Sequence, residues 1–152
     1  MTTDSPWLIG SWMSVVQQPN LVDELLGQED EYAGVALLAL TLNHHDPDVV
    51  LPRIKRGLGS MRAQTRANAL QSLGHHARLH GSIDVESLAR LRLALRHRTV
   101  LGGYEIRGYA ANAASDVGMF VSRAGLPRWL RRRFAGPRHP VRASARAQVN
   151  PS

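Results

Sequence analysis

The sequence contains no cysteine among its 152 residues. This absence excludes disulfide bonds, a thiol nucleophile, an iron–sulfur cluster and any zinc site with cysteine ligands. No apolar run approaches the ~20 residues that a membrane-spanning helix needs, so we expect no membrane partner. The first residues carry Asp4 and lack the basic start of a signal peptide, so we expect a cytoplasmic protein. The length fits one domain with a modest core.

Acidic residues are missing from one end of the chain and basic residues from the other. Residues 1–50 hold eight acidic residues and no Lys or Arg, whereas residues 122–152 hold eight arginines and no acid. Residues 1–121 are therefore nearly neutral, and the formal net charge of +7 comes from the C-terminal segment. Eighteen of the nineteen basic residues are arginine, a bias that GC-rich coding also produces, so we discount it as a nucleic-acid signal.

Apolar residues recur at helical spacing in six segments, and no segment shows the sustained period of two that a strand requires. The expected helices are a short one over 21–26, a second that begins at Ala33 and stops before Asp46, and a third that begins at Pro47 and ends within 57–60. Three more are expected over 61–80, 85–95 and 103–120. Expected N-caps are Asn20, Asp46, Ser60 and Asp84, and Gly81 is expected to close the fourth helix. The residues expected to face the core include Ala36, Leu37, Leu70, Leu73, Val85, Leu88, Leu91, Val117 and Phe120.

The six helices form three hairpins with short loops, and the second helices of the hairpins resemble one another. Ala36 and Leu37 align with Ala69 and Leu70, an offset of 33 residues. A helical hairpin cannot bury its apolar face alone, but stacked hairpins can. We therefore predict an all-α domain of three stacked hairpins over 1–121, with an irregular helical bundle as the alternative. Residues 122–152 are expected to form a disordered, Arg/Pro-rich tail.

For one part of that tail the sequence also allows a folded structure. Trp129, Leu130 and Phe134 are large apolar residues that could dock back onto the domain as one extra helical turn.

A family resemblance is carried by the fourth expected helix and the turn after it, with the sequence RANALQSLGHHARLHGSID at residues 66–84. The segment resembles small bacterial HEAT-like repeat proteins, some of which are immunity proteins encoded beside polymorphic or contact-dependent toxins. Arg66 and Pro52 fall where HEAT repeats carry an arginine and a kinking proline, and the resemblance covers about 36–120. It implies a right-handed αα-superhelix with a protein-binding role. The sequence departs from the family at the end of the last helix, where Asp116 is the one acidic residue, and in the arginine tail.

No pattern for catalysis or metal binding is present. The sequence contains no P-loop, Rossmann glycine motif or Gly-x-Ser-x-Gly elbow, and the acidic run from Asp23 to Glu31 is expected to be a solvated face. His76 and His80 share a helix face as a zinc pair would, but no third ligand accompanies them. We therefore expect a non-enzymatic protein with no cofactor and no metal.

The expected binding surface consists of polar residues on the second helices of the hairpins. The fourth helix presents Gln64, Asn68, Gln71, His75 and Arg78 on the side opposite its apolar residues. The residues selected as partner-binding are Glu31, Tyr32, Gln71, His75, Arg78, Asn112 and Asp116. Arg66 is expected to be structural and to pair with Asp46, Asp48 or Asp84.

These observations favour a protein-binding module, with an immunity protein that neutralises a cognate toxin domain as the leading hypothesis. The acidic first third would steer a basic toxin such as a nuclease. One alternative is a nucleic-acid-associated accessory protein that acts through the tail arginines with Trp129 and Phe134. Another is a generic protein-interaction scaffold. The pattern does not distinguish a monomer from an oligomer.

Overall fold

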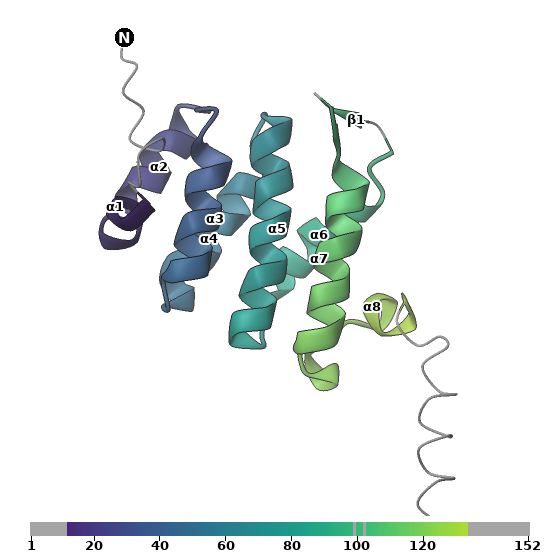
Figure 1. The fold of residues 1–152 in the computed structure, drawn as a ribbon. Helices are drawn as coiled ribbons and strands as arrows, with labels where there is room; N and C mark the ends of the chain where they lie inside the picture. The colour runs from purple at the N-terminus through teal and green to yellow at the C-terminus, as the bar shows by residue number, and fades with distance from the viewer. Residues whose placement is uncertain (1–11, 99, 102, 134–152) are drawn as a thin grey trace, which may run out of the picture.

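Helices make up most of the computed structural model, which describes residues 12–98, 100, 101 and 103–133 (Figure 1). The α-helices are α1 (Trp12–Gln17), α2 (Asn20–Gly27), α3 (Ala33–Asn43), α4 (Pro47–Leu58), α5 (Ala63–His80), α6 (Val85–Leu95), α7 (Ile106–Phe120) and α8 (Arg128–Arg133). A 3-10 helix, η2, covers Arg123–Gly125. The described ranges are mostly helical, as the prediction of an all-α fold requires. None of the helices in the described ranges is long and apolar enough to cross a bilayer.

One short β-ladder departs from the prediction that no strand would form. Strand β1 (Val100–Leu101) pairs antiparallel with β2 (Tyr104–Glu105), just before α7. Gly103, between the strands, has φ = +84°, which a residue without a Cβ adopts at little cost. The sequence hid this ladder because two residues are too few to show a period of two.

The helices lie in two layers. Helices α3, α5 and α7 stand side by side and form the front layer in Figure 1, while α2, α4 and α6 form the back layer. Helix α5 is central, because it packs against α3 on one flank, α7 on the other and α4 behind. The apolar residues of α5 are therefore buried from three directions, as its many small and aliphatic residues require.

The close approach of α3, α4 and α5 depends on glycines. A Cβ on Gly34 of α3 would lie 2.5 Å from Asn68 Oδ1 and 2.9 Å from the Cα of Thr65, both on α5. A Cβ on Gly57 of α4 would lie 2.7 Å from a methyl group of Leu37. Real Cβ atoms do not come this close to other atoms, so α3, α4 and α5 pack at a distance that larger residues would prevent.

The predicted core is mostly correct. Leu37, Leu40, Ile54, Leu70, Leu73 and Leu91 are fully or almost fully buried. Two predictions of burial are wrong: Val85 is 82% exposed and Phe120 is 39% exposed. Both lie at a helix end, where a side chain at helical spacing with the core can still point past the neighbouring element.

Side-chain and backbone caps confirm three of the predicted helix ends. Asp46 accepts a hydrogen bond from the backbone N–H of Asp48 (2.9 Å), and Asp84 accepts one from that of Ser87 (2.8 Å). Gly81 ends α5 with φ = +69°. Two other caps are wrong, because Asn20 is already the first residue of α2, and α5 begins only at Ala63, after Arg62.

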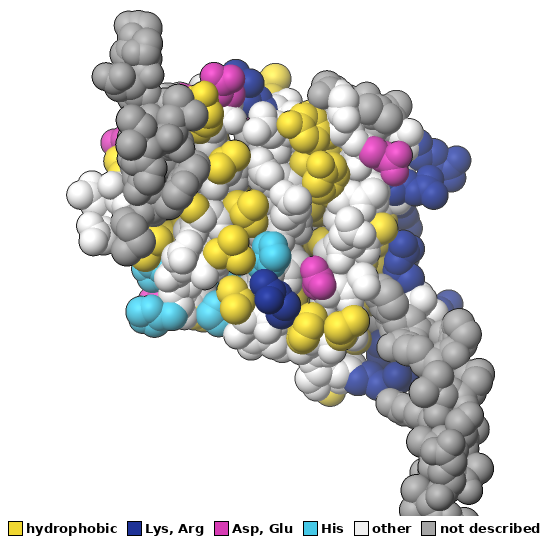
Figure 2. Space-filling model, in the orientation of Figure 1, with side chains coloured by type: hydrophobic (Ala, Val, Ile, Leu, Met, Phe, Trp, Pro, Cys, Tyr) yellow, Lys and Arg dark blue, Asp and Glu magenta, His cyan; other side chains and the backbone are white. Residues whose placement is uncertain are grey.

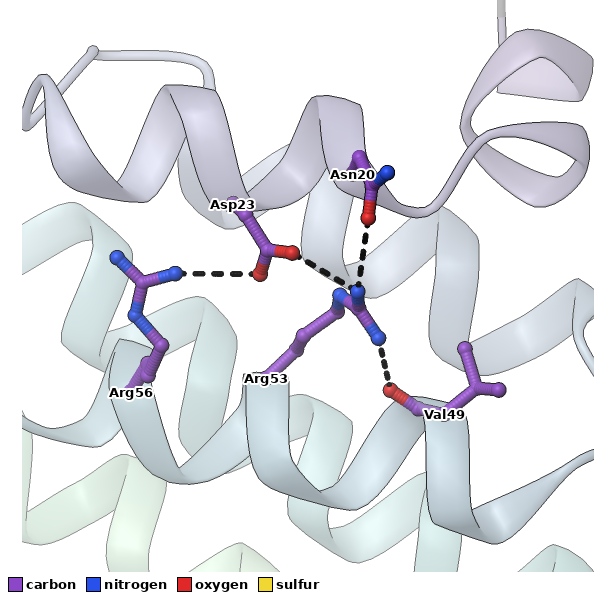
Figure 3. A network of polar contacts seen from close by, with 5 residues as sticks. All are labelled: Asn20, Asp23, Val49, Arg53 and Arg56. Carbon is purple, nitrogen blue, oxygen red and sulfur yellow. Dashed lines mark hydrogen bonds and ion pairs between the residues drawn. The ribbon is translucent and has the colours of Figure 1, made fainter.

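Ion pairs connect the helices of the back layer. Asp23 of α2 binds Arg53 Nη2 at 2.8 Å and Arg56 Nη1 at 3.1 Å, both from α4 (Figure 3). Arg53 also donates to the carbonyl of Val49 at 2.7 Å. Lys55, on the same helix, binds Asp84 at 2.8 Å at the start of α6. Partly exposed pairs of this kind add little to the free energy of unfolding, so they define which residues face each other more than they stabilise the fold.

The expectation for Arg66 is therefore wrong. None of the described carboxylates lies within ion-pair distance of Arg66, which instead lines a small cavity with Leu58, Leu70 and Ile106. Helix α4 supplies the basic partners through Arg53, Lys55 and Arg56, because it lies between the two acidic helix starts of the back layer.

The acidic run is only partly a solvated face. Glu29, in the turn before α3, accepts hydrogen bonds from the hydroxyl of Ser60 and the backbone N–H of Met61 in the turn before α5. These two bonds, first that of Ser60, lower the pKa of Glu29. Glu24 and Glu31 are exposed as expected.

The predicted boundary at residue 121 is also wrong. Helices η2 and α8 follow α7 directly, and Leu126 and Leu130 belong to the same buried core as the rest of the domain. The alternative that Trp129 and Leu130 dock back is confirmed, while Phe134 lies outside the described residues, as does the remainder of the predicted tail. The folded domain therefore extends at least to Arg133.

Replacing Leu130 by Ala tests this boundary. Leu130 is fully buried, so Leu130→Ala should lower the free energy of unfolding by roughly 3 kcal/mol in urea melts. Arg131→Ala, a change at an exposed neighbour, should leave the urea midpoint unchanged. A urea midpoint that Leu130→Ala leaves unchanged would show that residues 122–133 do not belong to the folded domain.

A pair of glycine substitutions tests the close packing of the front layer. Gly34→Ala should destabilise the protein by about 1–2 kcal/mol, because the backbone of Thr65 cannot move aside and overpacking outweighs the higher helix propensity of Ala. In Gly74→Ala, by contrast, the new Cβ meets only the side chain of Asp116, so stability should change little. Equal urea midpoints for the two variants would contradict this explanation.

Candidate protein-binding surface

The exposed side of the front layer carries the predicted binding residues of α5 and α7. Gln71, Arg78 and Asn112 are exposed, and His75 and Asp116 are half-buried. Three of these residues come together at the junction of the two helices, and we call His75, Arg78 and Asp116 the α5–α7 cluster. Figure 2 shows this face, on which a His, a basic and an acidic side chain gather over α5 and α7.

Hydrogen bonding within the α5–α7 cluster defines its protonation. Arg78 Nη2 lies 2.8 Å from His75 Nδ1. A guanidinium group only donates hydrogen bonds, so Nδ1 of His75 must accept and the imidazole carries its proton on Nε2. Burial, and next the positive charge of Arg78, lower the pKa of His75 against the opposing effect of Asp116. A neutral His75 at neutral pH agrees with its role as an acceptor.

Asp116 is positioned by a glycine of the neighbouring helix. Its carboxylate lies over Gly74 of α5, so close that a Cβ there would fall 2.6 Å from Asp116 Oδ2. Sequence reasoning assigned Gly74 to the buried side of α5 and missed this role. The close approach of α5 and α7 therefore brings the carboxylate of Asp116 within electrostatic reach of His75.

A second polar pair repeats this arrangement toward the start of α5. Asn68 lies over Gly34 of α3 and donates a hydrogen bond to Gln71 Oε1 at 2.8 Å. Its own Oδ1 is buried and has no hydrogen-bond donor among the described residues. Gln71 is thus held in position by its neighbour, as a preorganised surface group would be.

The remaining predicted residues lie apart from the α5–α7 cluster. Glu31 and Tyr32 belong to the turn before α3, at the end of the front layer where α5 also begins, whereas the cluster lies in the second halves of α5 and α7. Tyr32 packs partly into the core. Asn112 is exposed one turn before Asp116. The seven residues therefore do not form one continuous patch.

Two hydrophobic side chains beside the cluster were missed. Leu79, 48% exposed, follows His75 by four residues, and Met119, 69% exposed, follows Asp116 by three, so each shares the exposed face of its helix. Figure 2 shows hydrophobic side chains directly beside the polar group. The helical spacing that selected the polar residues would have found both, had exposed apolar residues been considered.

The histidine pair behaves as a structural feature. His76 is 1% exposed, and its ring lies 4.6 Å from that of His80. Burial, and next the proximity of His80, lower the pKa of His76 to about 4. No group of three His, Asp or Glu side chains within the described ranges is arranged to hold a metal ion.

Comparisons with known proteins provide no relative. No protein-family model matches the chain, and neither a curated protein nor a solved structure matches it. The argument for function therefore depends on the geometry above.

The buried His76 should make stability sensitive to mild acid. Its folded-state pKa of about 4 lies below the ordinary value of 6.5, so the unfolded chain binds the proton first and stability falls as pH drops from about 6.5 to about 4. Between pH 7 and pH 5 the titration of His76 should lower the free energy of unfolding by up to about 2 kcal/mol.

His76→Gln removes this titration, so the difference between urea melts at the two pH values should shrink in the variant. His75, whose pKa is lowered as well, is present in both proteins and cancels. An identical pH dependence in the two proteins would show that His76 is not buried in its neutral form.

Proposed function

We propose that this protein is a non-enzymatic HEAT-like binding module that acts in the cytoplasm as an immunity protein and neutralises a cognate toxin domain. The observation that carries the proposal is the α5–α7 cluster with Leu79 and Met119 at its edge. Protein interfaces depend on a few well-packed residues at which apolar area and charged groups meet, and Arg and Met are enriched there.

The arrangement of the hairpins supports a HEAT-like reading. Helices α2 and α3, α4 and α5, and α6 and α7 are consecutive pairs, and the second member of each pair stands in the front layer. In a HEAT-like array the second helices line the binding face. The resemblance at residues 66–84 falls on the helix that carries His75 and Arg78.

The chemistry of the surface favours binding over catalysis. A general acid–base pair needs a carboxylate whose pKa is raised toward neutrality, whereas the shifted carboxylates of the described chain, Glu29 and Asp84, have lowered pKa values. For Asp84, burial opposes the shift, but hydrogen bonds from Lys55 and Ser87 outweigh it. Both carboxylates hold turns and helix ends in place.

The partner we propose carries an excess of basic residues. Glu24, Glu31 and Asp48 are exposed acidic residues in the first third of the chain, which has no Lys or Arg. They would accelerate encounter with a basic toxin, and this effect would weaken with added salt.

Binding and growth assays with the toxin domain encoded beside this gene test the proposal. The full-length protein should form a 1:1 complex of nanomolar affinity, about −12 kcal/mol, and co-expression should restore growth. The double variant His75→Ala/Arg78→Ala should bind at least about tenfold more weakly. Gly74→Ala should also weaken binding, because it displaces Asp116 without removing it.

Arg107→Ala is the matched control. Arg107 is exposed on α7 but lies about 180° around the helix from Asp116, so its loss should not affect binding. If Arg107→Ala and the cluster variants change the affinity equally, the toxin domain does not bind at the α5–α7 cluster. If the protein retains nucleic acid with steep salt dependence and does not retain the toxin domain, the nucleic-acid alternative replaces the immunity proposal.

A further inference from the structure

A groove with an apolar floor lies between α6 and α8, at the C-terminal end of the helix stack. Its volume is about 580 Å³, and its lining includes Val85, Leu88, Leu93, Leu126 and Trp129. Val85 is 82% exposed and Leu93 67% exposed, values unusual for large aliphatic side chains that line the same groove. None of these residues belongs to the α5–α7 cluster.

The groove lies where the back layer stops. Helix α4 is flanked by α2 and is joined by Lys55 to the start of α6. On its other side α6 has no further long helix in the described part of the chain, and the six-residue α8 packs against α7. The apolar flank of α6 therefore has the shape and chemistry of a helix-binding surface without a helix on it.

Positive charge surrounds this apolar floor. Arg92 and Arg96 line the groove, and the Arg92 guanidinium lies 5.6 Å from the centre of the Trp129 ring. No acidic side chain of the described chain forms an ion pair with either arginine. Helix α8 adds the exposed residues Arg128, Arg131, Arg132 and Arg133. Figure 2 shows Lys and Arg side chains along this edge of the molecule.

The arginines around the groove limit which kind of molecule could bind in it. Residues 134–152 contain three arginines and no acid, so like charges disfavour this segment of the chain itself. A nucleic-acid backbone would satisfy the arginines but leave Val85 and Leu93 exposed to water. We propose that the groove binds an amphipathic helix of another protein, one that carries acidic residues beside its apolar stripe. The inference does not depend on the proposed immunity function, since it concerns a different surface.

Fluorescence anisotropy with the full-length protein and designed probes tests the proposal. The first probe is a labelled peptide of about 15 residues with leucines at i, i+3, i+4 and i+7 and glutamates beside them. The second probe has lysines in place of the glutamates, the third has serines in place of the leucines, and the fourth is single-stranded DNA. The first probe should bind at least about tenfold more tightly than the second and third.

Two groove variants, Leu93→Glu and Arg96→Glu, and one control variant, Met61→Glu, locate the binding. Leu93→Glu should weaken binding of the first probe at least about tenfold, whereas Met61→Glu, at an 87% exposed position outside the groove, should not. Arg96→Glu should reduce binding of the glutamate probe and increase binding of the lysine probe. Circular dichroism melts should show that all three variants keep the wild-type fold.

Several outcomes would overturn the proposal. Equal binding of the leucine and serine peptides would reduce the groove to a charged surface. Tighter binding of the DNA, insensitive to Leu93→Glu, would assign the arginines to nucleic acid. Self-association of the protein in sedimentation, lost in Leu93→Glu, would identify a second copy of this chain as the occupant.

Discussion

The close approach of α5 to its neighbours is the constraint on which the rest of the structure depends. Gly34 and Gly57 allow α3, α4 and α5 to pack at distances that any Cβ would prevent, and Gly74 does the same for the side chain of Asp116. Because α5 is buried on three sides, the glycines of α3 and α4 determine how closely it packs, and its own Gly74 determines where Asp116 lies on the exposed face. Packing and surface chemistry are therefore consequences of the same residues.

The back layer is held in register by charge. Its helices pair through partly exposed ion pairs, with Asp23 and Asp84 at two helix starts and the basic residues of α4 between them. Such pairs add little free energy, but a wrong pairing would bring like charges together. Close packing thus supplies the stability of the domain, and charge restricts which helices of the back layer face each other.

The two candidate surfaces differ in how far their side chains are already held by contacts within the domain. The α5–α7 cluster is held in place by contacts within the domain, since Arg78 donates to His75 and the Asp116 carboxylate lies over Gly74. A partner would meet it in a preorganised state. The groove between α6 and α8 leaves the apolar side chains of Val85 and Leu93 exposed to solvent. Neither Arg92 nor Arg96, which also line it, forms an ion pair with an acidic residue of the described chain. The stack ends there, so no further helix of the described chain covers α6.

The sequence by itself determined helices α2 to α7, because helical spacing, Asp46, Gly81 and Asp84 act within a few residues of one another. It also identified the polar residues of α5 and α7, since one face of a helix follows from numbering alone. Only the tertiary structure decided which carboxylates meet Arg53 and Lys55, why Arg66 has none, and that Leu130 belongs to the core. The ion pairs of Arg53 and Lys55 join residues about 30 positions apart, and local spacing contains no information about which helices become neighbours.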